Sequence, residues 1–227
     1  MHGLHRLWNR QAIRAFDIWA PDYAAVAAKK LHERGYSYEY LALFIQTQLG
    51  KPETGLLVEI GTGPGTLGQR LASTLGVKLV GVDISLAMLE RIPLGTYYYT
   101  ICASAEALPL RSASAAGLYS AFALHSVKNR GQALREIRRV LAPCALGVVV
   151  DLAPATRGLP VLGLVVRLLH SLRYEHGAPA NYVTTDRLVE ELLQEGLEVL
   201  HVEELGLPKS YRHVAVTFQR TPNEFIA

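Results

Sequence analysis

The sequence predicts an α/β fold: a Rossmann-like, doubly wound sheet of seven strands, mostly parallel with an antiparallel last strand, and helices on both faces. From Leu56 onward, short β-branched runs alternate with helical patterns, as in a parallel sheet covered on both sides. The last two strand patterns, 197–205 and 213–220, are joined by GLPKSYR. This connection is too short for a helical crossover, so it favours an antiparallel pair.

The earlier elements follow the same alternation. A helix is expected after each of the first two strands, in GQRLASTL and in SLAMLERI, and a further helix over 131–141, where apolar and arginine residues alternate with helical spacing. A clear helix is expected from the capping pair Thr185-Asp186 to Gly196. Because crossovers between parallel strands are right-handed, this alternation predicts a doubly wound topology. Strands are expected at 56–60, 78–84, 97–104, 117–122 and 146–151.

Composition excludes several classes of protein. The formal charge of +3 is too small to indicate nucleic-acid binding, which needs a concentrated basic face. The longest apolar segment, 159–172, is too short and too interrupted to span a bilayer, and no signal peptide is visible. Cys102 and Cys144 are too few for a metal cluster or a disulfide framework, and their apolar neighbours predict buried, inert thiols. We therefore expect a cytoplasmic protein with no metal site and no membrane insertion.

A glycine loop in VEIGTGPGTL carries the first functional signal. The dinucleotide fingerprint G-x-G-x-x-G would need a glycine where this chain has Thr66, so the spacing argues against an NAD-dependent oxidoreductase. Glu59, just before the loop, would repel a pyrophosphate but favour a cationic amino group. Asp83 ends the next strand about twenty residues later, a position suited to ribose hydroxyls. The loop alone would be explained equally well by a tight turn.

Together these motifs resemble a known family. VEIGTGPGTLGQRLA, VGVDISLAML, ASAEALPL, SAFALHSV and ALREIRRVLAP are similar to class I S-adenosylmethionine-dependent methyltransferases. The nearest group contains the ubiquinone/menaquinone-biosynthesis and other small-molecule enzymes, known as methyltransferase type 11. The resemblance is firm over 54–151, and FDIWAPDYAA (16–25) matches more loosely a segment in which a tyrosine covers the cofactor.

The resemblance implies S-adenosyl-L-methionine as the cofactor and assigns residues to its parts. The glycine loop and Glu59 would hold the methionine end, Asp83 the ribose and Ile84 the adenine, while Ser120, Ala121 and Phe122 would lie beside the sulfonium. Met88 taken alone is as well explained as a core residue. The residues implied in cofactor binding are Tyr23, Glu59, Gly61, Thr62, Gly63, Gly65, Asp83, Ile84, Met88, Ser104, Ala105, Glu106, Ser120 and Ala121.

Two positions depart from the family pattern. Ser104 stands where the family commonly has an aspartate that binds the adenine amino group, so recognition would depend on the Ala105 backbone and on stacking. Pro143-Cys144-Ala145 replaces the usual Pro-Gly-Gly turn, which changes the turn more than the site.

Two residues are candidates for a general base, which is needed if the acceptor must lose a proton. His125 follows the fourth strand, where substrate would arrive, although a structural histidine at a helix start explains it slightly better. Asp151 ends the fifth strand, where acids face the ligand crevice of open α/β sheets, or else caps the following segment.

Other polar and aromatic residues are candidates for the substrate side, the sheet or the surface. Tyr23, His170 and Tyr174 could line the substrate side, and Tyr97 to Tyr99 are expected to pack in the sheet. Tyr211 and His213 bracket the last turn and fit either the substrate side or the surface.

We expect one methyltransferase domain over 1–227, acting as a monomer or homodimer. It would comprise an N-terminal helical cap (1–50) over the carboxyl edge of the sheet, a cofactor-binding core (54–151), a substrate-side insertion (152–184) and a C-terminal helix with a strand pair (185–227). The apolar run 159–172 would give an apolar pocket or a dimer face.

The predicted function is methyl transfer to an oxygen or carbon, less favourably a nitrogen, of a small and partly apolar molecule. The alternatives are an RNA or protein acceptor, and a non-catalytic S-adenosylmethionine-binding protein. The expected partner is a small-molecule substrate, with nucleic acid unfavoured.

Overall fold

The structure, a computed structural model, describes residues 2–50, 55–75, 78–154, 180–207 and 211–222. Seven strands form one sheet in the order β3-β2-β1-β4-β5-β7-β6. Strands β1 to β5 pair in parallel, and β7 is antiparallel to both β5 and β6. The predicted fold class and the antiparallel final pair are therefore confirmed. The strands are β1 (Leu56–Ile60), β2 (Lys78–Asp83), β3 (Tyr99–Cys102), β4 (Ala115–Ala121), β5 (Leu141–Pro154), β6 (Leu197–Leu205) and β7 (Tyr211–Arg220).

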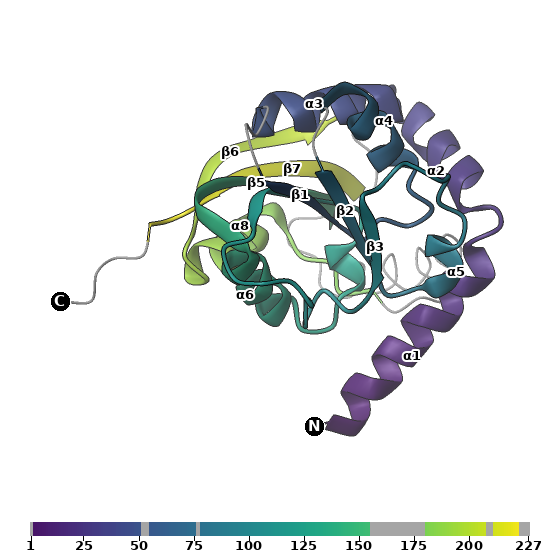
Figure 1. Ribbon diagram of the computed structural model, residues 1–227, viewed down its shortest axis with the longest axis horizontal. Helices are drawn as coiled ribbons and strands as arrows, with labels where there is room; N and C mark the ends of the chain where they lie inside the picture. The colour runs from purple at the N-terminus through teal and green to yellow at the C-terminus, as the bar shows by residue number, and fades with distance from the viewer. Residues whose placement is uncertain (1, 51–54, 76–77, 155–179, 208–210, 223–227) are drawn as a thin grey trace.

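Helices cover both faces of the sheet (Figure 1). One core cluster joins the sheet to α6 and α8, and a second joins its other face to α3 and α4. Helix α1 runs along one side of the molecule next to α5 (Figure 1). The helices are α1 (His2–Trp19), α2 (Tyr23–His32), α3 (Tyr38–Leu49), α4 (Thr66–Leu75), α5 (Leu86–Leu89), the 3-10 helix η1 (Leu124–Ser126), α6 (Arg130–Val140) and α8 (Thr185–Gln194).

Local sequence explains where these helices begin and end. The Thr184 side chain accepts from the Arg187 backbone N–H and caps α8, so the cap lies one residue before the predicted pair Thr185-Asp186. Gly196 follows the helix with φ of +69°, as predicted for its C-terminal glycine. Asn129 caps α6 in the same way, accepting from Gln132.

Two cysteines and two tyrosines lie where the sequence did not predict them. Both Cys102 and Cys144 are exposed, which contradicts the expectation of buried thiols. Cys102 lies on β3, an edge strand, and Tyr98 and Tyr99 beside it are exposed as well. Cys144 has φ of +62°, a conformation that favours the glycine of the usual turn.

The end of β7 is more buried than its position beside a turn suggests. Tyr211 and His213 are both buried, because β7 lies between β5 and β6. His213 is hydrogen bonded through Nδ1 to the Tyr36 hydroxyl and lies against the Phe122 ring.

The expected apolar helix over 159–172, with His170 and Tyr174, lies outside the described residues. Among the residues that are described, no helix is both long enough and apolar enough to cross a bilayer.

Close packing in the sheet generates a stability prediction at Gly147 on β5. A Cβ at this position would lie 2.3 Å from Cζ of the fully buried Phe218 ring. Gly147→Ala should therefore lower the free energy of unfolding by about 1–3 kcal/mol. Urea denaturation followed by circular dichroism measures this change.

Gly131→Ala is the matched control, because the nearest atom to its Cβ would be 3.5 Å away and the residue lies in α6. Alanine favours the helix by about 1 kcal/mol over glycine, so this variant should be as stable as the parent or more so. Equal stability of the two variants would show that the Gly147 contact does not limit packing.

Candidate functional site

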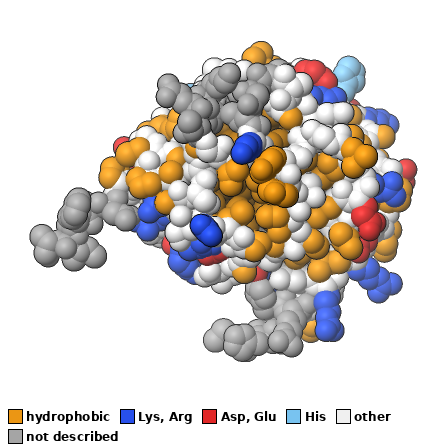
Figure 2. All heavy atoms as spheres, in the orientation of Figure 1, with side chains coloured by type: hydrophobic (Ala, Val, Ile, Leu, Met, Phe, Trp, Pro, Cys, Tyr) orange, Lys and Arg blue, Asp and Glu red, His pale blue; other side chains and the backbone are white. Residues whose placement is uncertain are grey.

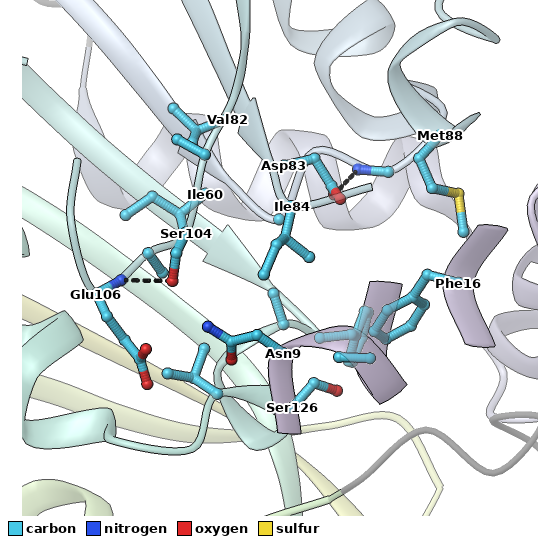
Figure 3. Close-up of a pocket in the computed structure, with 18 of the residues that line it drawn as sticks. Asn9, Phe16, Ile60, Val82, Asp83, Ile84, Met88, Ser104, Glu106 and Ser126 are labelled. Atoms are coloured by element: carbon cyan, nitrogen blue, oxygen red, sulfur yellow. Dashed lines mark hydrogen bonds between the residues drawn. The ribbon is translucent and has the colours of Figure 1, made fainter. Parts of the chain in front are cut away.

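A cavity opens at the carboxyl ends of β1 to β4 and is bounded on its other side by α1 (Figure 3). It encloses about 740 Å³ of space free of protein atoms, a volume that includes open solvent. This edge of an open parallel sheet is where ligands of such folds bind. The lining residues are Asn9, Ala12, Phe16, Tyr23, Ile60, Gly61, Gly63, Val82, Asp83, Ile84, Met88, Ala103, Ser104, Ala105, Glu106, Phe122, Ala123, Ser126 and Val127.

The glycine loop forms the floor of the cavity. The Gly61 and Thr62 N–H groups both donate to the Val82 carbonyl, at 2.8 and 3.2 Å, so the loop turns back over the end of β2. Gly61 has φ of +75°, and a Cβ there would lie 2.1 Å from the Cβ of Ala123. Only glycine permits this contact between the loops that follow β1 and β4.

Asp83 connects the glycine loop to the next strand end. Its Oδ2 accepts from the Gly63 N–H at 2.7 Å, and its Oδ1 accepts from the Ser85 N–H at 2.8 Å. Burial raises the pKa of this carboxyl group, although these backbone hydrogen bonds act in the opposite direction. A carboxylate has further lone pairs, so it can also accept from ligand hydroxyls in the cavity.

Glu59 is buried beneath the loop, and no basic side chain in the described parts of the chain is paired with it. Its Oε2 accepts from the Tyr119 hydroxyl at 2.9 Å and from the Tyr97 hydroxyl. Burial raises the pKa of Glu59 to about 8, while the two tyrosine hydrogen bonds act to lower it. At neutral pH the ligand-free protein therefore holds this group mainly in its protonated form, and a nearby cation would favour ionisation.

The structure distributes the predicted cofactor-binding residues over two adjoining spaces. Tyr23, Gly61 and Phe122 line both the main cavity and a smaller pocket beside it. Gly65 and Ser120 line neither space, and the buried Ser120 hydroxyl has no hydrogen-bond partner within the described parts of the chain. Besides the shared residues, Gly63, Asp83, Ile84, Met88, Ser104, Ala105 and Glu106 line the main cavity, and Glu59, Thr62 and Ala121 line the smaller pocket.

The two acid–base candidates lie in contact with each other. Asp151 Oδ1 lies 2.5 Å from His125 Nδ1, and its Oδ2 accepts from the His125 N–H at 2.8 Å. The imidazole is stacked on Tyr182 with ring centroids 5.0 Å apart. This pair lines a small pocket of its own rather than the main cavity, whose wall begins at the next residue, Ser126.

The sequence predicts a helical cap over this edge of the sheet, but it does not identify the α1 residues that line the cavity. Asn9, Ala12 and Phe16 lie on one face of the helix and line the cavity. Their spacing of three and four residues is the available signal, but it does not say what the face covers. Near one end of this face the Trp8 indole donates to the Ser126 carbonyl at 2.9 Å.

The opposite end of α1 is anchored to the loop after β2. The Ser85 hydroxyl donates to Asp17 Oδ1 at 2.6 Å. Helix α1 is therefore connected to the loop after β2 at one end and to η1 at the other, with the cavity between them.

Over the ranges that the structure describes, no group of three or more His, Cys, Asp or Glu residues could hold a metal ion.

Comparison with known proteins agrees with this geometry. Residues 58–149 match the family model "Methyltransferase domain". The chain is 28% identical over 212 residues to a demethylmenaquinone methyltransferase of Thermotoga maritima, covering 84% of this chain and 90% of that protein. It is 26% identical over 196 residues to a malonyl-[acyl-carrier protein] O-methyltransferase of a Marinomonas species, covering 81% and 70%.

A solved structure shows the same fold. Geranyl diphosphate C-methyltransferase of Streptomyces coelicolor, in complex with S-adenosyl-L-homocysteine, aligns with a TM-score of 0.66 at 13% identity over 80% of this chain and 77% of that one. The cavity suits the cofactor of such enzymes, because it offers apolar walls, a carboxylate at a strand end and an adjoining buried acid. Together these matches support a class I S-adenosylmethionine-dependent methyltransferase that uses S-adenosylmethionine as its cofactor.

Proposed function

We propose that this methyltransferase acts on an oxygen or a carbon of a small, partly apolar molecule, with nitrogen a less favourable acceptor. The observation that carries the proposal is the apolar wall where the cavity meets the smaller pocket, formed by Tyr23, Phe122 and Ala123 together with Phe16. One relative named above is an O-methyltransferase and the structural neighbour is a C-methyltransferase, which supports both acceptor atoms.

The order of residues along the cavity supports a placement for the cofactor. The methionine end would lie at the glycine loop, with its ammonium group toward Glu59. Asp83 would accept from the ribose hydroxyls, and the adenine would lie between Ile84 and the segment Ser104 to Glu106. Tyr23 would cover the methionine end, because it lines both spaces at this point.

Bound S-adenosylmethionine supplies a sulfonium methyl group that is already electrophilic, so the protein mainly has to align and desolvate the reacting atoms. Phe16, Tyr23 and Phe122 would exclude water from that end of the cavity. Phe122 is held there by a hydrogen bond from its N–H to the Val150 carbonyl at 2.7 Å, with φ of +58°. Positive φ is costly for a bulky residue and is found mainly at functional sites.

We propose the His125–Asp151 pair as the base for acceptors that must lose a proton. An Asp hydrogen bonded at Nδ1 fixes the orientation of a histidine and assigns the acceptor role to Nε2. The pair lies one residue from the cavity wall, behind Ser126. The competing explanation is structural, since Asp151 accepts from the His125 backbone N–H and thereby joins β5 to η1.

A macromolecular acceptor is the alternative with the least support. On the face shown in Figure 2, Lys and Arg side chains are scattered among acidic and apolar ones rather than gathered. RNA recognition would need such a concentrated basic surface.

The proposal predicts which acceptors become labelled. With methyl-labelled S-adenosylmethionine, we expect at least one small phenol, enol or apolar carboxylate to accept the labelled methyl group. Total RNA and total protein should stay unlabelled. Labelling confined to RNA or protein would overturn the proposal, and inspection of the labelled atom by NMR separates oxygen from carbon.

His125→Ala tests the base in the same assay. We expect kcat to fall about 100- to 10,000-fold, as for loss of a general base, while the affinity for S-adenosylhomocysteine is unchanged. His201→Ala is the control, because His201 is an exposed histidine on β6. Normal turnover of the His125 variant would remove this residue from the base role.

The raised pKa of Glu59 predicts proton release when the cofactor product binds. At pH 7 the group is mostly protonated, and the ammonium group of S-adenosylhomocysteine favours its ionised form. Binding should therefore release up to about one proton, and affinity should increase with pH until it levels off above about 8. Calorimetry at pH 7 in two buffers with different ionisation enthalpies counts the protons.

Glu59→Gln provides the comparison for this measurement. It keeps an oxygen that can accept from the tyrosine hydroxyls but cannot ionise, so proton release from this site should disappear. If the variant releases as many protons as the parent protein, the released proton comes from another group, such as Asp83.

A further inference from the structure

The side chain of Asn9 points from α1 into the cavity (Figure 3). The neighbouring Trp8 is hydrogen bonded to the Ser126 carbonyl, which fixes this turn of the helix against the cavity wall. Among the described residues, the Asn9 carboxamide has no hydrogen-bond partner. Asn9 is partly exposed and the cavity is open to solvent, so water can solvate the carboxamide until a ligand displaces it. A ligand that displaces this water then has to satisfy the carboxamide.

Two polar side chains that face this part of the cavity accept hydrogen bonds from local backbone, whereas the Ser126 hydroxyl oxygen is buried and has no hydrogen-bond partner among the described residues. The Ser104 hydroxyl oxygen accepts from the Glu106 N–H at 3.2 Å. Glu106 Oε1 accepts from the Asn129 N–H at 2.7 Å, at the cap of α6. Ile84 and Val127 are apolar, so a flat ring placed here finds stacking surfaces but few groups for its polar edge.

Adenine presents such an edge, with a 6-amino donor beside the ring nitrogen N1, an acceptor. A carboxamide carries an acceptor and a donor in the matching arrangement, which is why Asn and Gln pair with adenine in two hydrogen bonds. A carboxylate would match the amino group but repel the N1 lone pair, and a single hydroxyl could satisfy only one of the two atoms.

We propose that Asn9 is the residue that recognises adenine in this methyltransferase: its amide oxygen accepts from the 6-amino group and its amide N–H donates to N1. The N-terminal helix is thereby part of the cofactor site as well as its cover. This inference rests on the cofactor placement proposed above, with adenine between Ile84 and the Ser104 to Glu106 segment.

The test is a cycle of binding measurements that does not depend on turnover. Isothermal calorimetry compares S-adenosylhomocysteine with its analogue lacking the 6-amino group, in the parent protein and in Asn9→Ala. The parent should prefer the adenine compound about tenfold, since one hydrogen bond in a desolvated site is removed. In Asn9→Ala the preference should disappear, which identifies the interacting pair.

Three further variants keep the outcome interpretable. Asn9→Leu keeps the volume of the side chain without its polar atoms and should behave like Asn9→Ala. Gln11→Ala, on the exposed side of the same helix, should keep the full preference. Alanine is the better helix former, so a lower melting temperature is not expected for either alanine variant. Asp83→Asn should weaken both ligands equally, because it acts on the ribose.

Each result has one meaning for the inference. If Asn9→Ala keeps the tenfold preference while Asp83→Asn weakens binding, Asn9 does not recognise adenine and the proposed cofactor placement stands. If Asp83→Asn leaves the affinity for S-adenosylhomocysteine unchanged, the placement itself is wrong, and the inference about Asn9 is overturned with it.

Discussion

The close approach of two loops at Gly61 is the constraint on which the site depends. The Cβ of Ala123 occupies the space that any side chain at position 61 would need. The loop after β1 therefore lies directly against the loop after β4, and its N–H groups turn toward the Val82 carbonyl. Gly63 in the same loop donates to Asp83, so three strand ends are held in one arrangement. This packing determines the position of the glycine loop, which forms the floor of the cavity.

The second consequence of that arrangement is a pair of buried acids that have no basic partner among the residues the structure describes. Glu59 is hydrogen bonded to tyrosine hydroxyls and Asp83 to backbone N–H groups, and burial raises the pKa of both carboxyl groups. The negative charge of Asp83 raises the pKa of Glu59 further. Burying two acids close together is unfavourable for folding, and such groups concentrate where a ligand supplies the compensating interactions. An ammonium group and ribose hydroxyls would supply them here.

The parts of the fold that could be predicted from sequence are those determined by local pattern. Alternating β-branched and helical segments indicated the parallel strands, and a short connection indicated the antiparallel pair. The residue types and neighbours of Cys102 and Tyr99 match those of a buried strand, so the sequence predicts an interior position for both. Their exposure comes from the position of β3 at the sheet edge, which depends on strand order. The burial of His213 depends on strand order too, since β7 lies between β5 and β6.

Some residues of the candidate site could likewise be located from sequence, and others depend on how the elements pack. Residues on strand ends, such as Asp83 and Ser104, could be located because parallel strands all end at one edge of the sheet. The contact between His125 and Asp151 follows from the pairing of β4 with β5, though the sequence placed them only separately at that edge. The N-terminal cap could be predicted as a segment, but Asn9 could not be assigned to the cavity, because the periodicity of a helix face does not indicate what that face covers.

The position of α1 over the cavity depends more on apolar burial than on its two polar anchors. The hydrogen bonds made by Trp8 and Asp17 each contribute about 1 kcal/mol net in a typical protein. Ala12, Ala15 and Trp19 are nearly fully buried on the same helix, and burial of an aromatic side chain alone contributes a comparable or larger amount. The helix face that buries these residues is continuous with the face that carries Asn9 and Phe16. The same apolar contacts that hold the helix against the core thus set the orientation of the side chains that reach the cavity.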